Sequence, residues 1–197
     1  MKIRRKNTLS GGFSLVELLV VISIIVILAS LIIASLPGIQ NKANRNQVQN
    51  FMAELESGLE KYQIDHGIYP QNPSGSNGDR DSTGIEGAKV LYQHLSGDYL
   101  MDDGKVDPDE KIYVLRLDYW TSERNSKNPR SVKTSDGYTI VDTYGSPVRY
   151  IADPPNISPE ERKTFNPTYD LWSTAGNEGD PDDFSVQANY ITNWQSK

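Results

Sequence analysis

The chain has 197 residues, of which 20 are basic and 26 are acidic, and it contains two histidines and no cysteine. The acidic balance argues against a nucleic-acid-binding protein, which would carry a basic surface. No disulfide can constrain the loops, and with two histidines, no cysteine and no glycine-rich phosphate loop the sequence offers little for an enzyme. We therefore expect a structural protein rather than an enzyme, although scattered aspartates and glutamates leave a hydrolase open.

An apolar segment near the start of the chain dominates the sequence. The segment from position 13 to position 36 has 24 residues and a single ionisable side chain, Glu17. As a helix this segment would be about 36 Å long, enough to cross the roughly 30 Å hydrocarbon core of a bilayer. A carboxylate in such a segment costs roughly 2.5–3.5 kcal/mol near the membrane centre, so we interpret Glu17 as functional and expect it to have a partner.

The charges on either side of this segment predict its orientation. Four basic residues precede Gly12, which places the N-terminus in the cytoplasm and everything after residue 36 outside it. Without those four, 16 basic residues face 26 acidic ones, a net charge near −10. We divide the chain into a basic leader, a transmembrane helix, an amphipathic continuation and an exported globular domain, at residues 1–12, 13–36, 37–66 and 67–197.

The residues at the start of the apolar segment resemble a known family. Gly11-Gly12-Phe13-Ser14-Leu15-Val16-Glu17, after a short basic leader, is similar to the processing signal of type IV pilins and of the pseudopilins of type II secretion. In that family a prepilin peptidase cuts after the glycine and methylates the new N-terminus. The resemblance places these events at Gly12 and Phe13, and it implies that Glu17 pairs with the terminal amine of a neighbouring subunit. Burying a carboxylate beside an ammonium costs less free energy of desolvation than burying either charge alone.

Two alternatives compete with this interpretation. A secretory signal peptide has an apolar core of roughly 7–15 residues and a small-residue cleavage site after it, whereas this segment is longer and follows its glycine pair. An ordinary signal anchor would have no use for Glu17.

The helix is expected to continue beyond the membrane, from Phe13 to about Asp65. Its second half carries apolar residues at helical spacing, with charged residues largely on the other side. Pro37-Gly38 predicts a kink or a local opening, and Gly67 a helix end. The alternative is an anchor and a separate helix joined flexibly at Pro37-Gly38. The apolar positions are Val48, Phe51, Met52, Leu55, Leu59 and Tyr62.

The remaining residues predict an α+β fold in which the long helix packs on a small antiparallel sheet, the fold of type IV pilins and pseudopilins. Composition predicts an exposed loop over residues 71–87 and a short helix over residues 88–99, with Val90, Leu91, Leu95 and Tyr99 facing inward. Period-2 alternation predicts a half-buried strand over residues 113–119. Polar composition predicts a loop over residues 122–136, and the four prolines of residues 153–167 predict an irregular excursion. Further strands are expected at residues 138–141, 148–152 and 169–173.

Two features invite a metal hypothesis and do not support it. His94 has no second histidine or cysteine at ligand spacing, so we expect a surface or core residue. Residues 102–110 are acidic but lack the ligand spacing of a calcium-binding EF-hand loop, which favours a solvated turn.

The end of the chain carries a stronger metal hypothesis. Tyr169-Asp170-Leu171-Trp172-Ser173, a glycine-rich acidic loop and Asn193-Trp194 resemble the C-terminal half of the major pseudopilins of type II secretion, whose loop binds one Ca²⁺. Two departures are Asp142-Thr143-Tyr144-Gly145, where the family prefers Asp-Pro-Trp-Gly, and one extra residue after Ser173. The ligands that the resemblance implies are the carbonyls of Ala175 and Asp180 and the side chains of Glu178, Asp182 and Asp183.

The charges of this loop also favour a bound calcium ion. Its four carboxylates, at positions 178, 180, 182 and 183, repel one another unless a cation lies among them, and Ca²⁺ accepts either glutamate or aspartate. The alternative is an acidic loop left in water.

The resemblance implies a single-pass protein of the bacterial inner membrane with its C-terminal domain in the periplasm. It would assemble into a homo-oligomeric pseudopilus, with minor pseudopilins and an inner-membrane assembly platform, and drive type II secretion across the outer membrane. One alternative is a type IV pilus subunit for adhesion or motility, although pilins of that kind often close a C-terminal loop with a disulfide. The other is a signal-anchored periplasmic binding domain, which would not need Glu17.

Overall fold

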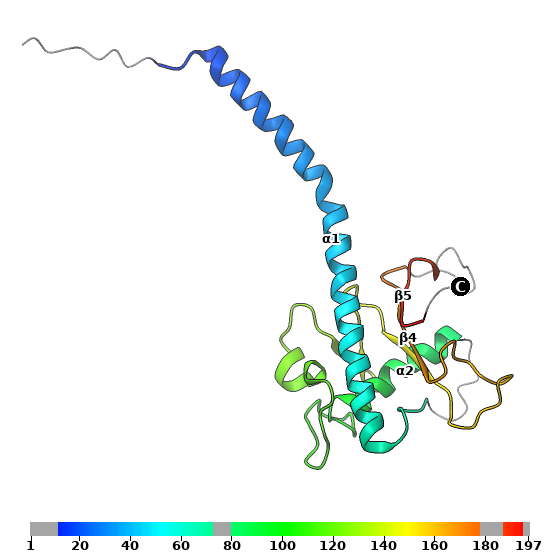
Figure 1. Ribbon diagram of the computed structural model, residues 1–197. Helices are drawn as coiled ribbons and strands as arrows, with labels where there is room; N and C mark the ends of the chain where they lie inside the picture. The colour runs from blue at the N-terminus through cyan, green and yellow to red at the C-terminus, as the bar shows by residue number, and fades with distance from the viewer. Residues whose placement is uncertain (1–11, 73–79, 178–186, 195–197) are drawn as a thin grey trace, which may run out of the picture. The chain divides into compact units, whose positions relative to one another are not determined.

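The computed structural model describes residues 12–72, 80–177 and 187–194. Its contacts divide the chain into two compact units, Met1–Lys42 and Ala43–Lys197. The elements are shown in Figure 1. They are α1 (Leu15–His66), α2 (Arg80–Leu95), a 3-10 helix (Leu115–Leu117), a π-helical turn (Tyr119–Glu123), β1 (Ser131–Thr134), β2 (Gly137–Ile140), β3 (Arg149–Ala152), β4 (Tyr169–Ser173) and β5 (Ile191–Thr192).

The first half of α1 presents apolar side chains on every side. Each large apolar side chain between Leu15 and Ile33 is at least 48% exposed, and the helix is long and apolar enough to cross a membrane. The hydroxyls of Ser23 and Ser30 donate to the carbonyls of Leu19 and Ile27 at 2.7 Å, so these polar groups are satisfied within the helix. Among the described residues of its own unit, this surface therefore finds no partner.

The prediction of one long helix is confirmed. α1 remains helical through Pro37 and Gly38, so the alternative of two separate helices does not hold. The helix ends where expected, because Gly67 adopts φ +80° and its amide donates to the carbonyl of Gln63 at 2.7 Å. The kink at Pro37-Gly38 stays a prediction.

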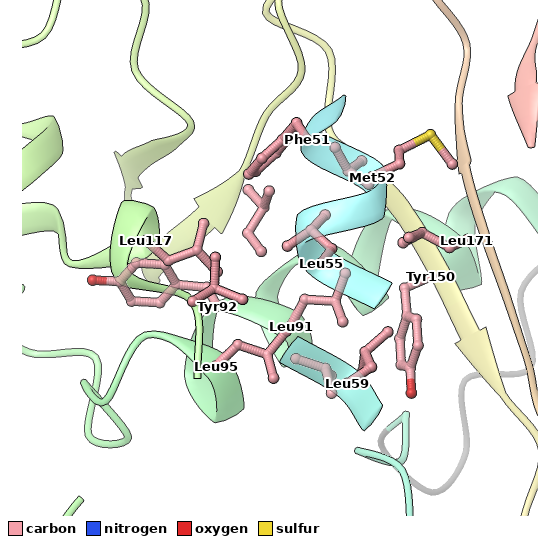
Figure 2. Packing of buried hydrophobic residues seen from close by; sticks show 14 of the residues in the cluster. Phe51, Met52, Leu55, Leu59, Leu91, Tyr92, Leu95, Leu117, Tyr150 and Leu171 are labelled. Atoms are coloured by element: carbon pink, nitrogen blue, oxygen red, sulfur yellow. The ribbon is translucent and has the colours of Figure 1, made fainter. Parts of the chain in front are cut away.

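The second half of α1 buries a single stripe of side chains. The predicted residues Val48, Phe51, Leu55 and Leu59 are fully buried, and Met52 is 4% exposed. Figure 2 shows this stripe meeting apolar residues of α2, β3 and β4. Burying one such side chain contributes roughly 1.5–3 kcal/mol, so the stripe accounts for much of the stability of the C-terminal unit. The partners labelled in Figure 2 include Leu91, Leu95, Tyr150 and Leu171.

The strands form two small antiparallel sheets in place of the single one expected. One pairs β1 with β2, and the other has the order β3-β4-β5, with Tyr150 opposite Leu171. α2 packs against β2 and β3. The predicted strands at residues 138–141, 148–152 and 169–173 correspond to β2, β3 and β4, while residues 153–167 contain no strand, as expected.

α2 begins at Arg80, so the predicted exposed loop is wrong for residues 80–87. Its glycines suggested a loop, but they serve close packing. A Cβ on Gly87 would lie 1.9 Å from the carbonyl oxygen of Tyr150, and one on Gly84 would lie 2.5 Å from the Trp172 ring. Val90, Leu91 and Leu95 are buried as predicted, whereas Tyr99 lies beyond the helix and is 44% exposed.

The strand predicted at residues 113–119 is wrong. The amides of Tyr113 and Val114 both donate to the carbonyl of Leu95 at 3.0 Å, which ties this segment to the end of α2 rather than to a neighbouring strand. Val114 is 2% exposed and Leu115 is 74% exposed, and burial along the segment does not alternate with a period of two. The predicted loop at residues 122–136 is also wrong in part, because β1 lies within it and pairs with β2.

Candidate functional site

The predicted processing site lies just ahead of α1. Gly12 and Phe13 are exposed and non-helical, and the helix begins at Leu15. The Phe13 side chain is 86% exposed, and no atom lies within 4 Å of the position where Gly12 would carry a Cβ. The peptide bond between the two residues is therefore open to an approaching enzyme.

Glu17 lies in the first turn of α1. Its Oε2 accepts the amide of Ser14 at 3.4 Å, which helps to satisfy the free amides of the helix N-terminus. Around it on the same helical surface lie Ser14, Val16, Val20 and Val21, all of them exposed. Within the described residues no basic group forms an ion pair with Glu17. The helix therefore presents an exposed carboxylate on an apolar surface, which suits a cation supplied by another molecule.

The base of the predicted calcium loop is held by Asp142. This carboxylate is buried, and it accepts the amides of Tyr144 and Ser146 at 2.8 and 3.1 Å and the hydroxyl of Ser173. The Ser173 hydroxyl in turn accepts the amide of Ala175 at 2.9 Å. Asp142 therefore joins the β2–β3 turn to the end of β4, where the loop begins. The motif Asp142-Thr143-Tyr144-Gly145 drew attention to this turn, but its bond to Ser173 was not foreseen.

The calcium site stays a prediction, because Glu178, Asp180, Asp182 and Asp183 lie outside the described residues. Ala175 is buried with φ +52°, and its carbonyl accepts the Asn177 side-chain amide at 3.4 Å. The neighbouring Thr174 hydroxyl is buried and has no hydrogen-bond partner among the described residues.

Arg80 joins three distant parts of the C-terminal unit. Its guanidinium pairs with Asp170, whose side chain is completely buried, and lies over the rings of Phe165, Trp172 and Trp194 at 4.2, 4.7 and 5.0 Å. Asp170 also accepts the amides of residues 165 and 166. Arginine suits this place better than lysine, because its guanidinium stacks on the rings while one nitrogen donates to Asp170 and another to the carbonyl of Lys163. This cluster, which we call the Arg80 clamp, holds α2, the proline-rich excursion and the end of the chain together, and no sequence pattern pointed to Arg80.

The chain is similar to a pilin over most of that pilin's length. It is 38% identical over 125 residues to the type IV major pilin protein PilE of Neisseria gonorrhoeae, which covers 60% of this chain and 71% of the pilin. The chain belongs to the type IV pilin family. The long N-terminal helix and the small antiparallel sheets fit the α+β fold of this family.

This pilin-like chain also matches proteins of secretion systems. It is 44% identical over 64 residues to the type II secretion system core protein G of Klebsiella michiganensis, and 37% identical over 75 residues to that of Vibrio cholerae. These matches cover 32% and 38% of this chain and 45% and 49% of the relatives, so the chain spans about half the length of the secretion proteins it matches. No family model matches the chain. No solved structure matches it either.

Both histidines of this pilin-like chain lie against one tyrosine. Tyr62 shares a hydrogen bond of 3.1 Å with Nδ1 of His94 and stacks on His66, with ring centroids 4.1 Å apart. Nε2 of His66 lies 3.1 Å from the hydroxyl of Tyr113, which donates to Asp65 at 2.9 Å. Burial, followed by the charge of His66, lowers the pKa of His94. Among the residues that the structure describes, no three His, Cys, Asp or Glu side chains gather as metal ligands.

Several carboxylates of the acidic segment 102–110 are engaged within the turn itself. Asp103 pairs with Lys105 at 2.5 Å, and Asp107 accepts the amide of Leu100 at 3.1 Å. The amide of Asp107 donates to the carbonyl of Gly97 at 2.8 Å. These contacts describe a turn rather than a cage of carboxylates around an ion.

Proposed function

We propose that this chain is a structural subunit of a periplasmic pseudopilus that drives type II protein secretion across the outer membrane. The observation that carries the proposal is Glu17, the single carboxylate of the first half of α1, where the apolar side chains are exposed on every side. Such a helix requires a membrane or other helices around it, and its carboxylate requires a cation. The relatives named as type II secretion core proteins support the secretion role.

The subunit would first be inserted in the inner membrane with a single span. The basic residues before Gly12 favour a cytoplasmic N-terminus and a periplasmic C-terminal unit. A prepilin peptidase would then cut between Gly12 and Phe13 and methylate the new amine. The exposed, non-helical backbone at this point supports that step.

Assembly would join the amine of Phe13 in one subunit to Glu17 in its neighbour. Each subunit would supply an amine to one neighbour and a carboxylate to the other, and a head-to-tail contact of this kind builds a filament when it does not close into a ring. The pair would also let both charges leave water at less cost than either would alone. Minor pseudopilins and an inner-membrane assembly platform would be the other partners, and we assign the subunit no catalytic role.

A type IV pilus subunit is the second candidate. The match to PilE favours it, because that match extends over 125 residues, whereas the matches to the secretion proteins of Klebsiella michiganensis and Vibrio cholerae extend over 64 and 75. A pilus subunit would serve adhesion or motility rather than secretion.

Deletion of the gene tests the two candidates. Loss of proteins from the culture medium with surface pili intact supports a pseudopilin, while loss of pili or of twitching with secretion intact supports a pilin. A Glu17→Ala complement should fail like the deletion, and a Glu54→Ala complement should succeed, because Glu54 lies on the same helix and only approaches Arg116, at 3.9 Å. Full activity of the Glu17→Ala complement would contradict the assembly role and favour an anchored periplasmic domain.

We further propose that the acidic loop binds one Ca²⁺ through the carbonyls of Ala175 and Asp180 and the side chains of Glu178, Asp182 and Asp183. The ion would offset the repulsion among the carboxylates and hold the loop closed. Calcium should raise the melting temperature of the purified protein in detergent, magnesium should not, and Asp182→Asn/Asp183→Asn should abolish the difference. An unchanged melting curve at millimolar calcium would remove this site from the proposal.

A further inference from the structure

A pocket of about 390 Å³ lies between the end of α1 and the proline-rich excursion. About half of its wall residues are apolar, and the others include amide side chains, Arg162 and Asp153, whose carboxylate is engaged by Lys163 and Thr164. The size falls within the range of ligand pockets, which are roughly 300–1,000 Å³. We call it the proline pocket, and the residues that matter here are Ile68, Tyr69, Gln71, Asn156, Ile157 and Arg162.

The excursion is built to hold this pocket open. The carboxylate of Asp153 accepts the amides of Lys163 and Thr164 at 3.0–3.1 Å and the hydroxyl of Thr164 at 2.7 Å, so the two ends of the loop are tied together. At its tip Asn156 adopts φ +118°, a conformation that few residues other than glycine adopt. Backbone strain of this kind is found preferentially where a loop makes contacts with a ligand or partner.

Two polar groups of the pocket lack partners within the described residues. The Oε1 atom of Gln71 is buried and accepts no hydrogen bond. The guanidinium of Arg162 is exposed and forms no ion pair with any described carboxylate. Because Arg162 lies beside apolar wall residues, the pocket would suit a chain segment in which an apolar side chain is followed closely by a carboxylate.

The turn after α2 offers that combination. Leu100 is 68% exposed, and Asp102 is exposed and forms no ion pair with a described basic group. Between them Met101 adopts φ +54°, and the bond from the Leu100 amide to Asp107 fixes the backbone. We call residues 99–102 the Leu100 turn.

The segments that carry the proline pocket and the Leu100 turn lie apart in the C-terminal unit. In Figure 1 the green segment after α2 and the yellow-to-orange excursion lie on opposite sides of the C-terminal part of α1. They cannot meet within one molecule. Two different surfaces that complement each other from opposite sides of one subunit make a head-to-tail contact, which repeats along a filament.

We propose that the Leu100 turn of one copy docks into the proline pocket of the next copy, with Leu100 among the apolar walls and Asp102 paired with Arg162. This inference rests on the proposed filament, and it adds a second contact between subunits that is independent of Glu17. Charged pairs at such contacts set register and exclude wrong neighbours.

The absence of cysteine makes a direct test possible. The full-length protein would carry the pair Leu100→Cys/Ile157→Cys and be expressed in its own host, and intact cells would be treated with a mild oxidant. The expected result is a ladder of dimers, trimers and longer oligomers, which reducing agent collapses. The matched control is Leu115→Cys/Ile157→Cys, because Leu115 is 74% exposed but does not belong to the turn; it should remain monomeric.

Charge exchange tests the ionic part of the contact. In the Leu100→Cys/Ile157→Cys background, Arg162→Asp or Asp102→Arg should reduce the ladder about tenfold, because like charges would then face each other, and the two together should restore it. Both residues are exposed, so folding should be unaffected, which unchanged protein levels would verify.

Filaments seen by electron microscopy without a ladder above that of the Leu115→Cys control would overturn this contact and leave the proposed filament intact. A ladder that is indifferent to both single charge reversals would also overturn it. If cells form neither filaments nor a ladder, the proposed function fails together with the contact.

Discussion

The two halves of α1 differ in how their apolar side chains are shielded from water. Both are helical and rich in apolar residues, but the second half buries one stripe against α2, β3 and β4, whereas the first half exposes apolar residues all round. The fold of the chain itself buries a single apolar stripe. An apolar surface that covers the whole helix and includes a single carboxylate needs partners from outside, and this difference separates the residues that stabilise the subunit from those that would assemble it.

The largest expected effect contrasts one apolar residue from each half, one buried and one exposed. Leu55→Ala should lower the free energy of unfolding of the C-terminal unit by roughly 2–5 kcal/mol, because Leu55 is fully buried and its removal leaves a cavity. Ile24→Ala should leave that value unchanged, since Ile24 is 51% exposed in the other unit. Denaturant titration followed by tryptophan fluorescence measures this, because Trp120, Trp172 and Trp194 all lie in the C-terminal unit. Equal effects of the two substitutions would break the contrast.

The second largest loss of stability is expected from breaking the Arg80 clamp. Asp170→Ala removes a fully buried carboxylate and leaves Arg80 and two backbone amides without their acceptor, and we expect a loss of about 3 kcal/mol in the same titration. The control is Asp103→Ala, because Asp103 and its partner Lys105 are both half exposed and an exposed ion pair contributes little to stability. A loss for Asp170→Ala no greater than that of the control would show that the clamp is dispensable.

Glycine substitutions sharpen the contrast between the units. Gly87→Ala should destabilise the C-terminal unit by roughly 1–3 kcal/mol, because the new Cβ meets the rigid backbone of Tyr150. Gly38→Ala meets no atom within 4 Å and should instead strengthen α1 by roughly 0.5–1 kcal/mol of helix propensity. Circular dichroism and the fluorescence titration report the two effects. Tolerance of Gly87→Ala would mean that α2 shifts easily on β3.

The smallest effect should come from pH. Burial lowers the pKa of His94 below its unfolded value, so the unfolded state binds more protons near that value. The stability that neutral His94 contributes is therefore complete above the unfolded pKa of about 6.5 and is lost as the pH falls through the lowered folded pKa. Melting temperatures measured between pH 7 and 5 should fall less steeply for His94→Gln than for the wild type. Identical slopes would mean that His94 is neutral in both states or charged in both.

Helical periodicity predicted α1 and its buried stripe, and the glycine at position 67 predicted its end. These features depend on residues that are close in sequence. The local patterns failed where tertiary contacts decide. The glycines of residues 80–87 suggested a loop, yet Gly84 and Gly87 let α2 approach β3 and Trp172. The alternation of residues 113–119 suggested a strand, yet the carbonyl of Leu95 captures two successive amides there.

The candidate sites follow the same division. Gly12, Phe13 and Glu17 stood out because a local motif carries them. Asp142 was visible as part of a motif, but its bond to Ser173 joins residues 31 apart. Arg80 gave no local signal, since its partners lie around positions 165, 170, 172 and 194, and only the fold brings them together.

The Arg80 clamp also bears on how the subunit matures. Exported domains that close their C-terminal region with a disulfide depend on an oxidising compartment and on the enzymes that supply it. Here one guanidinium, one buried carboxylate and three aromatic rings join the end of the chain to α2 by contacts that form as soon as the chain folds. Completion of this domain therefore needs no electron acceptor, and the supply of folded subunits should be the same in the presence and in the absence of oxygen.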